Sequence, residues 1–519
     1  MLSVIFLALF PADNIWPHLI STTLPRYIFT TVLLMISVGV LAGIVGTSTA
    51  WFVVRYSFTG SSWLQWALLM PLAIPGYVGA YALVDLLEYA GPVQSTLRGV
   101  FGWSSSQDYW FPEIRSFGAA VFVLSLALYP YVYLLTRVAF RDQASSVEEV
   151  ARSLGASSYK RLFKINFPLA RPAIAAGVAI VMMETVNDFG TVDYFAVQTL
   201  TTGIFSVWLQ SSNVGGAAQL ACVVLAMVIL LVSLEKLSRR KMQFFNMSSK
   251  HNKVTKIKLK GFSNLLAFSC CFVPFLLGFA LPLLVLAEHS MSNPKLFLDR
   301  ALIDATWNTV FIGTIAAAFT VFLSIFMVFG MKSIKGRLPK IIMPITTIGY
   351  AVPGAVLGVG ILIPLAALDN GVADVIYYVT QIDIGLIFTG TSFAIILAYI
   401  VRFFAIGQGA TEAALGRISP NLEHAARSLG TSRTSILNRI HLPIIKGSLG
   451  SAMLLVFVDC VKELPATLLL RPFNFNTLST RVHEQASLED LVNAAPAAIY
   501  ISLVGLCAVV LLAKANKLD

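Results

Sequence analysis

The sequence has few charged residues. Asp, Glu, Lys and Arg make up 12% of its 519 residues, whereas apolar residues make up 57%. A typical soluble domain is about 25% charged and about 45–50% apolar. This shortage of charge excludes an ordinary soluble protein and indicates that lipid is the main solvent of the chain. The formal net charge is +11, but no soluble segment carries a basic patch with interleaved aromatics, so nucleic-acid binding is not predicted.

Cysteine is scarce as well, and the few cysteines lie in or beside apolar runs. None has the C-x2-C spacing of a metal site. We therefore expect small buried side chains rather than a disulfide framework or a firmly predicted metal site. The five residues are Cys222, Cys270, Cys271, Cys460 and Cys507.

The signatures of common enzymes are missing. The dipeptide Gly-Lys does not occur, so the chain has no phosphate-binding loop of the form G-x-x-x-x-G-K-[ST]. It also lacks the H-E-x-x-H metal motif and the G-x-S-x-G nucleophile motif. The sequence predicts neither an ATPase nor another enzyme, and no cofactor bound by this chain.

Long apolar runs are what the sequence has in place of charge. A spanning helix needs about 20 predominantly apolar residues. The stretch 1–10 is too short to span on its own and is the open case of a partial or twelfth span; it lacks the basic leader of a signal peptide. We expect an all-α integral membrane protein with eleven or twelve spans. Eleven segments are long enough: 27–54, 63–87, 116–138, 173–190, 217–235, 262–287, 306–329, 341–367, 385–406, 447–470 and 494–513.

Lys and Arg are concentrated in alternate loops, and the remaining loops carry mainly Asp and Glu. Cytoplasmic loops of membrane proteins carry the excess of Lys and Arg. We therefore place the basic loops and the C-terminus in the cytoplasm. The segment 236–260 carries nine Lys and Arg residues and no acid, as expected for a linker beside anionic lipid headgroups. It divides the chain into a first half, 1–235, and a second half, 261–519.

An internal repeat supports this division. Residues 148–168 read EEVARSLGASSYKRLFKINFP and residues 423–443 read EHAARSLGTSRTSILNRIHLP, which align without a gap at an offset of 275. Both copies lie in basic loops, so the halves keep the same direction in the membrane. This is typical of a parallel repeat about an axis along the membrane normal.

The repeated loop has the pattern of two short helices. Apolar residues at helical spacing are followed by a glycine, Gly155 or Gly430, which ends a helix without steric cost. A second amphipathic stretch then leads to Pro168 or Pro443, just before the next span. Such a loop either docks into a groove of a soluble partner or lies on the membrane surface. Two copies in identical register favour docking.

These residues resemble the EAA motif of binding-protein-dependent ABC importer permeases. Glu149-Val150 and His424-Ala425 stand where the family often has two alanines. The resemblance implies the pseudo-twofold type I permease fold, with coupling loops 141–171 and 413–446 docked on two copies of an ATPase that holds ATP and Mg. It also implies a substrate-binding protein, surrounding membrane lipid, a bacterial inner membrane, and one copy of this fused chain per transporter. The implied coupling residues are Glu148, Arg152, Gly155, Pro168, Glu423, Arg427, Gly430 and Pro443.

Three further stretches resemble the ferric-iron branch of fused permeases: 68–94, 183–195 and 459–484. The resemblance implies import of ferric iron by alternating access. Thiamine, aminoalkylphosphonate and polyamine permeases share the same framework and stay open as alternatives. An ion-gradient-driven secondary transporter is the rival of another class, since it also needs buried acids and parallel repeats.

The span after each coupling loop carries acids. Glu184 and Asp188 lie four residues apart on one helical face, and Asp459 and Glu463 repeat them at the offset of 275, beside Lys462. Ionised groups inside a membrane span usually face the bundle interior or water. One interpretation is a ring of carboxylates around a cation pathway, because hard oxygen donors suit a small, highly charged ion. The other is that the acids pair with Lys462, Arg471 or helix ends and hold the halves together.

A Pro-Gly pair interrupts one apolar segment in each half: Pro75-Gly76 and Pro353-Gly354. Proline removes a backbone donor and glycine adds freedom, so both segments are predicted to kink. A gate and the simple packing of a bent helix explain the pattern equally well.

Overall fold

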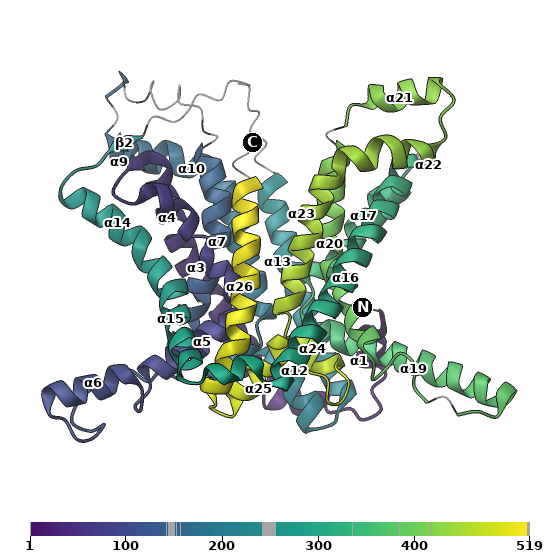
Figure 1. Ribbon diagram of the computed structural model, residues 1–519, viewed down its shortest axis with the longest axis horizontal. Coiled ribbons are helices and arrows are strands. Elements are labelled where there is room, and N and C mark those ends of the chain that lie inside the picture. Colours follow the sequence, from purple (N-terminus) through teal and green to yellow (C-terminus); the bar gives the residue numbers. More distant parts are fainter. Residues whose placement is uncertain are drawn as a thin grey trace.

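The structure is a computed structural model that describes residues 2–141, 143, 151, 153–155, 157–240, 256–334, 336–383, 385–416 and 418–515. The apolar runs fold into a bundle of helices (Figure 1). Glu148 and Arg152 lie outside the described residues.

The first part of the chain forms the following helices. They are α1 (Leu2–Leu9), α2 (Trp16–Ser21), α3 (Leu24–Arg55), α4 (Ser61–Ala67), η1 (Met70–Ala73), α5 (Gly76–Leu87), α6 (Pro92–Phe101), α7 (Phe117–Arg141), α9 (Ser158–Arg161), η2 (Leu162–Asn166), α10 (Phe167–Asn187), α11 (Gly190–Tyr194), α12 (Leu200–Phe205), η3 (Ser206–Gln210) and α13 (Val214–Arg240).

The second part of the chain forms the following helices. They are α14 (Phe262–Phe275), η4 (Leu276–Ala280), α15 (Leu281–Ser292), η5 (Pro294–Leu298), α16 (Arg300–Ser333), α17 (Leu338–Thr346), α18 (Ile348–Ala351), α19 (Gly354–Thr380), α20 (Ser392–Gly416), α21 (Pro420–Ser428), α22 (Arg433–Ile436), η6 (Leu437–His441), α23 (Leu442–Lys462), α24 (Pro465–Leu470), α25 (Leu478–Ser487) and α26 (Leu491–Ala515). Two-residue strands β1 (Tyr56–Ser57) and β2 (Ile257–Lys258) pair in parallel.

Ten helices in the described residues are long and apolar enough to cross a membrane, and Ser61–Ala73 with Gly76–Phe101 makes an eleventh if this bent pair counts as one span. The lower of the two expected numbers of spans, eleven, is therefore reached only if the bent pair counts as one span. The stretch 1–10 forms α1, which has eight residues and is too short to span.

The expected span 63–87 is formed by two helices that meet at an angle of 94°. The cause is Ile74-Pro75, whose backbone is extended with ψ of 122° and 146°. The expected helix 341–367 is broken in the same way at Val352-Pro353, where ψ is 129° and 142°. The predicted kinks are therefore complete breaks of the helix.

Equivalent helices of the two halves pack alike. Helix α3 contacts α7 and α10, and α16 contacts α20 and α23. The similarity extends to single bonds: the Leu200 N–H donates to Thr31 Oγ1 at 2.9 Å, and the Leu478 N–H donates to Thr309 Oγ1 at 2.8 Å. The main hydrophobic core draws on both halves and includes residues as distant in sequence as Val4 and Val509.

The halves differ at their first helix. In the second half α14, η4 and α15 form one long span, Phe262–Ser292, whereas the short α1 precedes α3. Helix α15 contacts α26 and α5, and α1 contacts their equivalents, α13 and α19. Each first helix thus packs on the last helix of its own half and on the helix after the Pro-Gly break of the other half.

Close helix packing in the first half depends on Gly46 of α3. A Cβ at this position would lie 2.7 Å from the Val132 Cβ and 2.8 Å from the Tyr129 carbonyl oxygen of α7. Small residues at such crossings let membrane helices approach closely. We expect Gly46→Val to lower the free energy of unfolding by about 1–3 kcal/mol, the usual cost of overpacking.

The measurement is thermal unfolding of the purified chain in detergent. The matched control is Gly450→Val in α23, because a Cβ there meets no atom within 4 Å. An equal loss of stability in both variants would contradict the importance of this crossing.

Candidate functional site

A polar cavity of about 170 Å³ lies between the two halves. Its charged lining comes from the ends of α10 and α23, the residues just after them, and α20. The structure brings all five predicted intramembrane residues to this one cavity. They are Glu184, Asp188, Asp459, Lys462 and Glu463.

Asp188 is engaged with the backbone of a helix. Its carboxylate accepts hydrogen bonds from the Thr191 N–H at 3.0 Å, the Val192 N–H at 3.1 Å and the Thr191 hydroxyl at 2.9 Å. These are the otherwise unsatisfied N–H groups at the start of α11. Asp188 therefore caps a helix end, as one of the two interpretations of the acids predicted.

Glu463 has the equivalent position in the second half. Its Oε1 accepts a hydrogen bond from the Ala466 N–H at 3.1 Å, in the first turn of α24. Its Oε2 lies 3.2 Å from Arg402 Nε, and both side chains are under 10% exposed. Arg402 also donates to the Val352 carbonyl at 3.2 Å, at the break before α19. One buried ion pair thus joins α20, α24 and that break.

The glycine of each Pro-Gly pair allows this packing. A Cβ at Gly354 would lie 2.3 Å from Glu463 Oε1 and 3.0 Å from Arg402 Nη1. A Cβ at Gly76 would lie 3.0 Å from Thr191 Oγ1. Pro75 and Gly76 also line the cavity directly. The two breaks and the acidic residues therefore form one structural layer.

Glu184 and Asp459 differ from the capping acids. Both are partly exposed and line the cavity, and no ion pair joins either to another described residue. Lys462, one turn from Asp459, donates to the carbonyl oxygen of Leu72 across the seam. In the part of the chain that the structure describes, no three His, Cys, Asp or Glu side chains gather as a metal site. The four acids therefore do not form a chelating ring in this conformation.

Sequence reasoning missed Arg402 and the tyrosines Tyr131 and Tyr350, which also line the cavity. Arg402 lies inside the predicted span 385–406, and a lone charge in a span is itself a signal of a buried partner or a pathway. Its repeat equivalent is the uncharged Ala127, so the internal repeat does not point to it. The tyrosines give no such signal, because aromatic residues are common throughout the spans.

The repeated loops lie at one end of the bundle. Figure 1 shows α9, α21 and α22 at the same end, with the C-terminal end of α26 pointing toward it. Gly155 and Gly430 both have φ of 76°, which confirms the predicted left-handed helix ends. Arg427 forms an ion pair with Glu423 one turn away. Pro168 and Pro443 lie in the first turns of α10 and α23.

The first-half loop is fixed to the bundle by Asn166. Its Oδ1 accepts a hydrogen bond from the buried Arg55 at 2.9 Å, and its carbonyl accepts one from Gln143 at 2.9 Å. In the second half the equivalent residue is His441, which is buried and packs on the Phe329 ring at 5.8 Å. Both contacts lie at the residue just before α10 or α23.

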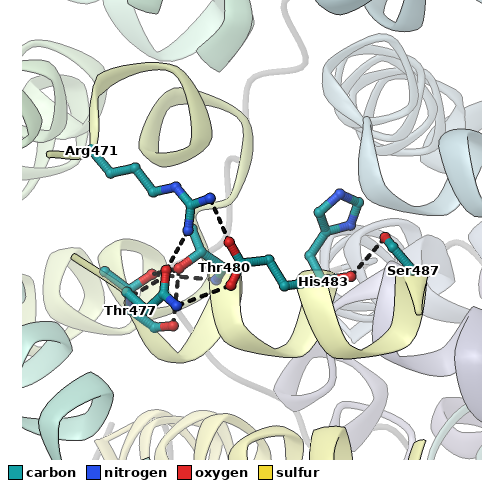
Figure 2. Close-up of polar contacts among 7 residues, drawn as sticks. Arg471, Thr477, Thr480, His483 and Ser487 are labelled. Carbon is teal, nitrogen blue, oxygen red and sulfur yellow. Dashed lines mark hydrogen bonds and ion pairs between the residues drawn. The ribbon is translucent and has the colours of Figure 1, made fainter. Parts of the chain in front are cut away.

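A second polar cluster lies at the opposite end of the bundle, around α25. Figure 2 shows Arg471 reaching toward α25, where it pairs with Glu484. Asn476 donates to the same carboxylate at 2.9 Å, so the loop before α25 is held at both ends. This loop carries Phe473, whose side chain is fully exposed.

His483 of α25 makes a contact between the halves. Its Nδ1 lies 3.0 Å from the Tyr81 hydroxyl of α5. Burial lowers the pKa of His483 to about 4, so the ring is neutral at ordinary pH.

Arg115 makes a second contact between the halves, an ion pair with Glu489 at 2.6 Å. These contacts hold the halves together on the side of α5.

Comparisons with known proteins agree with the repeat and the membrane fold. The profile of the family described as "Binding-protein-dependent transport system inner membrane component" matches residues 20–244 and 327–517. The Fe(3+)-transport system permease protein FbpB 2 of Haemophilus influenzae is 27% identical over 93% of this chain and 88% of that protein. The ferric transport system permease protein FbpB of Actinobacillus pleuropneumoniae is 24% identical over 86% of this chain and 64% of that protein.

Shorter relatives match part of the chain. The molybdenum transport system permease protein ModB of Escherichia coli is 28% identical over 38% of this chain and 86% of that protein. A match of nearly a whole relative to less than half of this chain is what a fusion of two permease halves produces.

The buried Arg402–Glu463 pair generates a stability prediction. Replacing one partner leaves a buried charge unpaired, which costs about 3–5 kcal/mol. We expect Arg402→Met to lower the melting temperature strongly. Glu463→Gln in addition should restore most of it, because the amide oxygen still accepts from the Ala466 N–H.

A double-mutant cycle on the purified chain measures this coupling. Additive losses from the two single variants would show that the pair does not hold these helices together.

Proposed function

Because the chain belongs to the family of binding-protein-dependent transport system inner membrane components, we propose that it is the permease of an ATP-driven importer for ferric iron. The observation that carries the proposal is the pair of equivalent loops at one end of the bundle, each leading into a helix that ends at the polar cavity between the halves. A secondary transporter has no use for two such loops in identical register.

The coupling step uses the exposed apolar face of each loop. Leu429 is 84% exposed beside Gly430, and Leu154 is 81% exposed beside Gly155. Exposed leucines on short, glycine-terminated helices suit a groove on a soluble partner. Two such faces call for two copies of the ATPase, which supplies ATP and Mg. The Arg427–Glu423 pair stabilises α21 in the docked loop.

Alternating access follows from the connection between loop and cavity. Helices α10 and α23 have 21 residues each and run from the loops to Asn187 and Lys462 at the cavity. When the ATPase dimer closes, both loops move, and these helices change the width of the cavity. The breaks at Pro75-Gly76 and Pro353-Gly354 let the helices α5 and α19 follow without stretching the rest of the bundle.

Ferric iron as the substrate is supported by the FbpB relatives, which align over most of this chain. Fe³⁺ is a hard cation that prefers oxygen ligands. Glu184 and Asp459 face the cavity and form no ion pair with another described residue, whereas Asp188 and Glu463 are occupied as helix caps. We assign passage of the ion to the first pair and support of the helix breaks to the second.

The remaining partners follow from the same scheme. One copy of the chain forms a transporter, since it contains both halves, with the boundary in 236–260. The loop end and the C-terminus face the cytoplasm of a bacterial cell, and the end with α25 faces a substrate-binding protein. The exposed Phe473, on a loop fixed by Arg471 and Glu484, is suited to anchor that protein.

The central test is ATPase activity in proteoliposomes that contain this chain, its ATPase and its binding protein. We expect ferric-loaded binding protein to stimulate hydrolysis, and binding proteins loaded with thiamine, phosphonate or polyamine to leave it at the basal rate. Stimulation by one of these instead would keep the importer and discard iron. An ATPase that fails to co-purify with the chain would remove the proposal as a whole.

The division of labour among the acids predicts separate effects. Glu184→Gln and Asp459→Asn should each lower ferric iron uptake by about tenfold or more, the effect of about 1.4 kcal/mol on the barrier, without lowering the melting temperature. Asp188→Asn should lower the melting temperature, because it weakens the cap of α11. Uptake is measured with radioactive iron in the same proteoliposomes. Wild-type uptake by both cavity variants would exclude them from the pathway.

A further inference from the structure

Helix α5 carries a stripe of polar side chains on one of its faces. Tyr77, Tyr81, Asp85 and Glu88 follow one another at intervals of four, four and three residues, so they lie one above the other along the helix. The stripe begins at Tyr77, which lines the polar cavity, and ends at Glu88, the C-cap of α5. At a rise of 1.5 Å per residue the stripe is about 16 Å long.

The exposure of these side chains rises along the stripe. Tyr77 and Tyr81 are 5% and 1% exposed, whereas the side chains of Asp85 and Glu88 are 26% and 46% exposed. Helix α6, which follows, lies at the end of the bundle opposite the repeated loops (Figure 1). The stripe therefore connects the cavity between the halves with the surface at that end.

Tyr77 is the residue of the stripe nearest the cavity, and its hydroxyl has no hydrogen-bond partner among the described residues. A buried polar group without a partner lowers stability, which makes it a candidate for a role in binding. Its oxygen is a hard donor, of the kind that a small, highly charged cation prefers. The ring of Tyr81 follows at 5.8 Å between centroids, so a second hydroxyl lies one turn further along.

The equivalent face of α19 has no polar stripe. At the offset of 278 that relates the two Pro-Gly pairs, the four positions hold Ala355, Val359, Ile363 and Ala366. A cation that passes along this face would lose its water ligands and gain no oxygen ligand from the helix. The two halves therefore differ in the side chains that α5 and α19 present between the cavity and the surface.

The elements that pack against α5 repeat this difference. The Tyr81 ring lies edge-on to Tyr194 of α11 at 4.4 Å, and the Tyr81 hydroxyl lies 3.0 Å from His483 Nδ1 of α25. The repeat equivalents of these partners are Leu469, at the offset of 275, and Phe205, at the offset of 278. Polar aromatic side chains thus surround the stripe on α5, whereas apolar side chains hold the equivalent positions.

The surface end of the stripe is acidic. Arg115 contacts Glu88 at 3.2 Å and Glu489 at 2.6 Å, and His289 contacts Asp85 at 2.7 Å. The three acids outnumber the two bases in this group. An excess of acids at an entrance raises the local concentration of a cation.

The stripe is closed in this conformation by polar contacts that join the first half to the second. Each contact would break if the halves separated on the side of α5, and the stripe would then face the gap between them. The contacts are Tyr81 with His483, Asp85 with His289, and Arg115 with Glu489.

We propose that the transported ferric ion enters the cavity along this face of α5, and that the equivalent face of α19 stays closed throughout the cycle. That the ion is ferric iron rests on the proposed function, whereas the side of entry rests on the polar stripe. When the halves separate, the hydroxyls of Tyr77 and Tyr81 replace water molecules around the ion as neutral oxygen donors. The ion then reaches Glu184 and Asp459 in the cavity.

The first test measures from which side the cavity opens. Single cysteines are placed in a chain whose native cysteines are replaced by alanine, and a membrane-impermeant maleimide is added to proteoliposomes at the face that binds the binding protein. Tyr81→Cys is compared with Val359→Cys, the equivalent position, which is equally buried. We expect Tyr81→Cys to react only during ATP turnover, with whichever loaded binding protein stimulates the ATPase, and Val359→Cys to stay protected.

This test does not depend on the identity of the substrate. Reaction of both cysteines during turnover would show that the two sides open alike, and protection of Tyr81→Cys throughout would exclude the stripe as an entrance. Either outcome overturns the proposal.

The second test removes the hydroxyls and keeps the rings. We expect Tyr77→Phe and Tyr81→Phe each to lower the amount of iron transported per ATP hydrolysed by about tenfold. Tyr129→Phe in α7 is the matched control, because its hydroxyl is also buried without a partner among the described residues but does not line the cavity. It should transport iron like the wild type.

Wild-type transport by both stripe variants would exclude the hydroxyls as ligands and overturn the proposal. Failure of ferric-loaded binding protein to stimulate the wild-type transporter would instead count against iron as the substrate, and the reactivity of Tyr81→Cys and Val359→Cys would still decide the side of entry.

Discussion

A broken helix inside a membrane leaves backbone N–H and C=O groups that lipid cannot satisfy, and the centre of this protein is built around that constraint. The chain is interrupted before α5, α11, α19 and α24. Asp188 and Glu463 satisfy the freed N–H groups of α11 and α24. Arg402 and Lys462 satisfy the freed carbonyls of Val352 and Leu72. These four charged side chains thus have a structural role at the breaks that is independent of any substrate.

This requirement separates two kinds of buried acid. A carboxylate that caps a helix is held by several hydrogen bonds and has little freedom to bind a passing ion. Glu184 and Asp459 lie one turn earlier in the chain. They cap no helix among the described residues, and they face the cavity. The same repeat therefore supplies both the acids that support the breaks and the acids that face the cavity, at a spacing of four residues.

Much of this arrangement could be predicted from the sequence, because it rests on local chemistry. Gly155 and Gly430 stand at helix ends because a left-handed residue is needed there, and both have that conformation. The shared helical face of the acids followed from their spacing of four residues, repeated at the offset of 275. The complete breaks at Pro75 and Pro353 did not follow, since proline alone is compatible with a bent but continuous helix. Arg402 was missed because its position has no charged equivalent in the other half, and the contact of Tyr81 with His483 depends on packing between segments far apart in sequence.

The charged residues around the cavity also show an effect of joining the halves in one chain: a charged residue can occur in one half and be absent from the other. Both bases, Arg402 and Lys462, belong to the second half, and their equivalents in the first half are Ala127 and Asn187. In a channel assembled from two identical subunits, any such residue would occur twice, and the cavity would be either balanced or strongly acidic. A single polypeptide can carry each base once and keep an intermediate excess of negative charge. In the fused chain, a single substitution changes the net charge of the cavity by one unit. In a dimer of identical subunits the same substitution would change it by two.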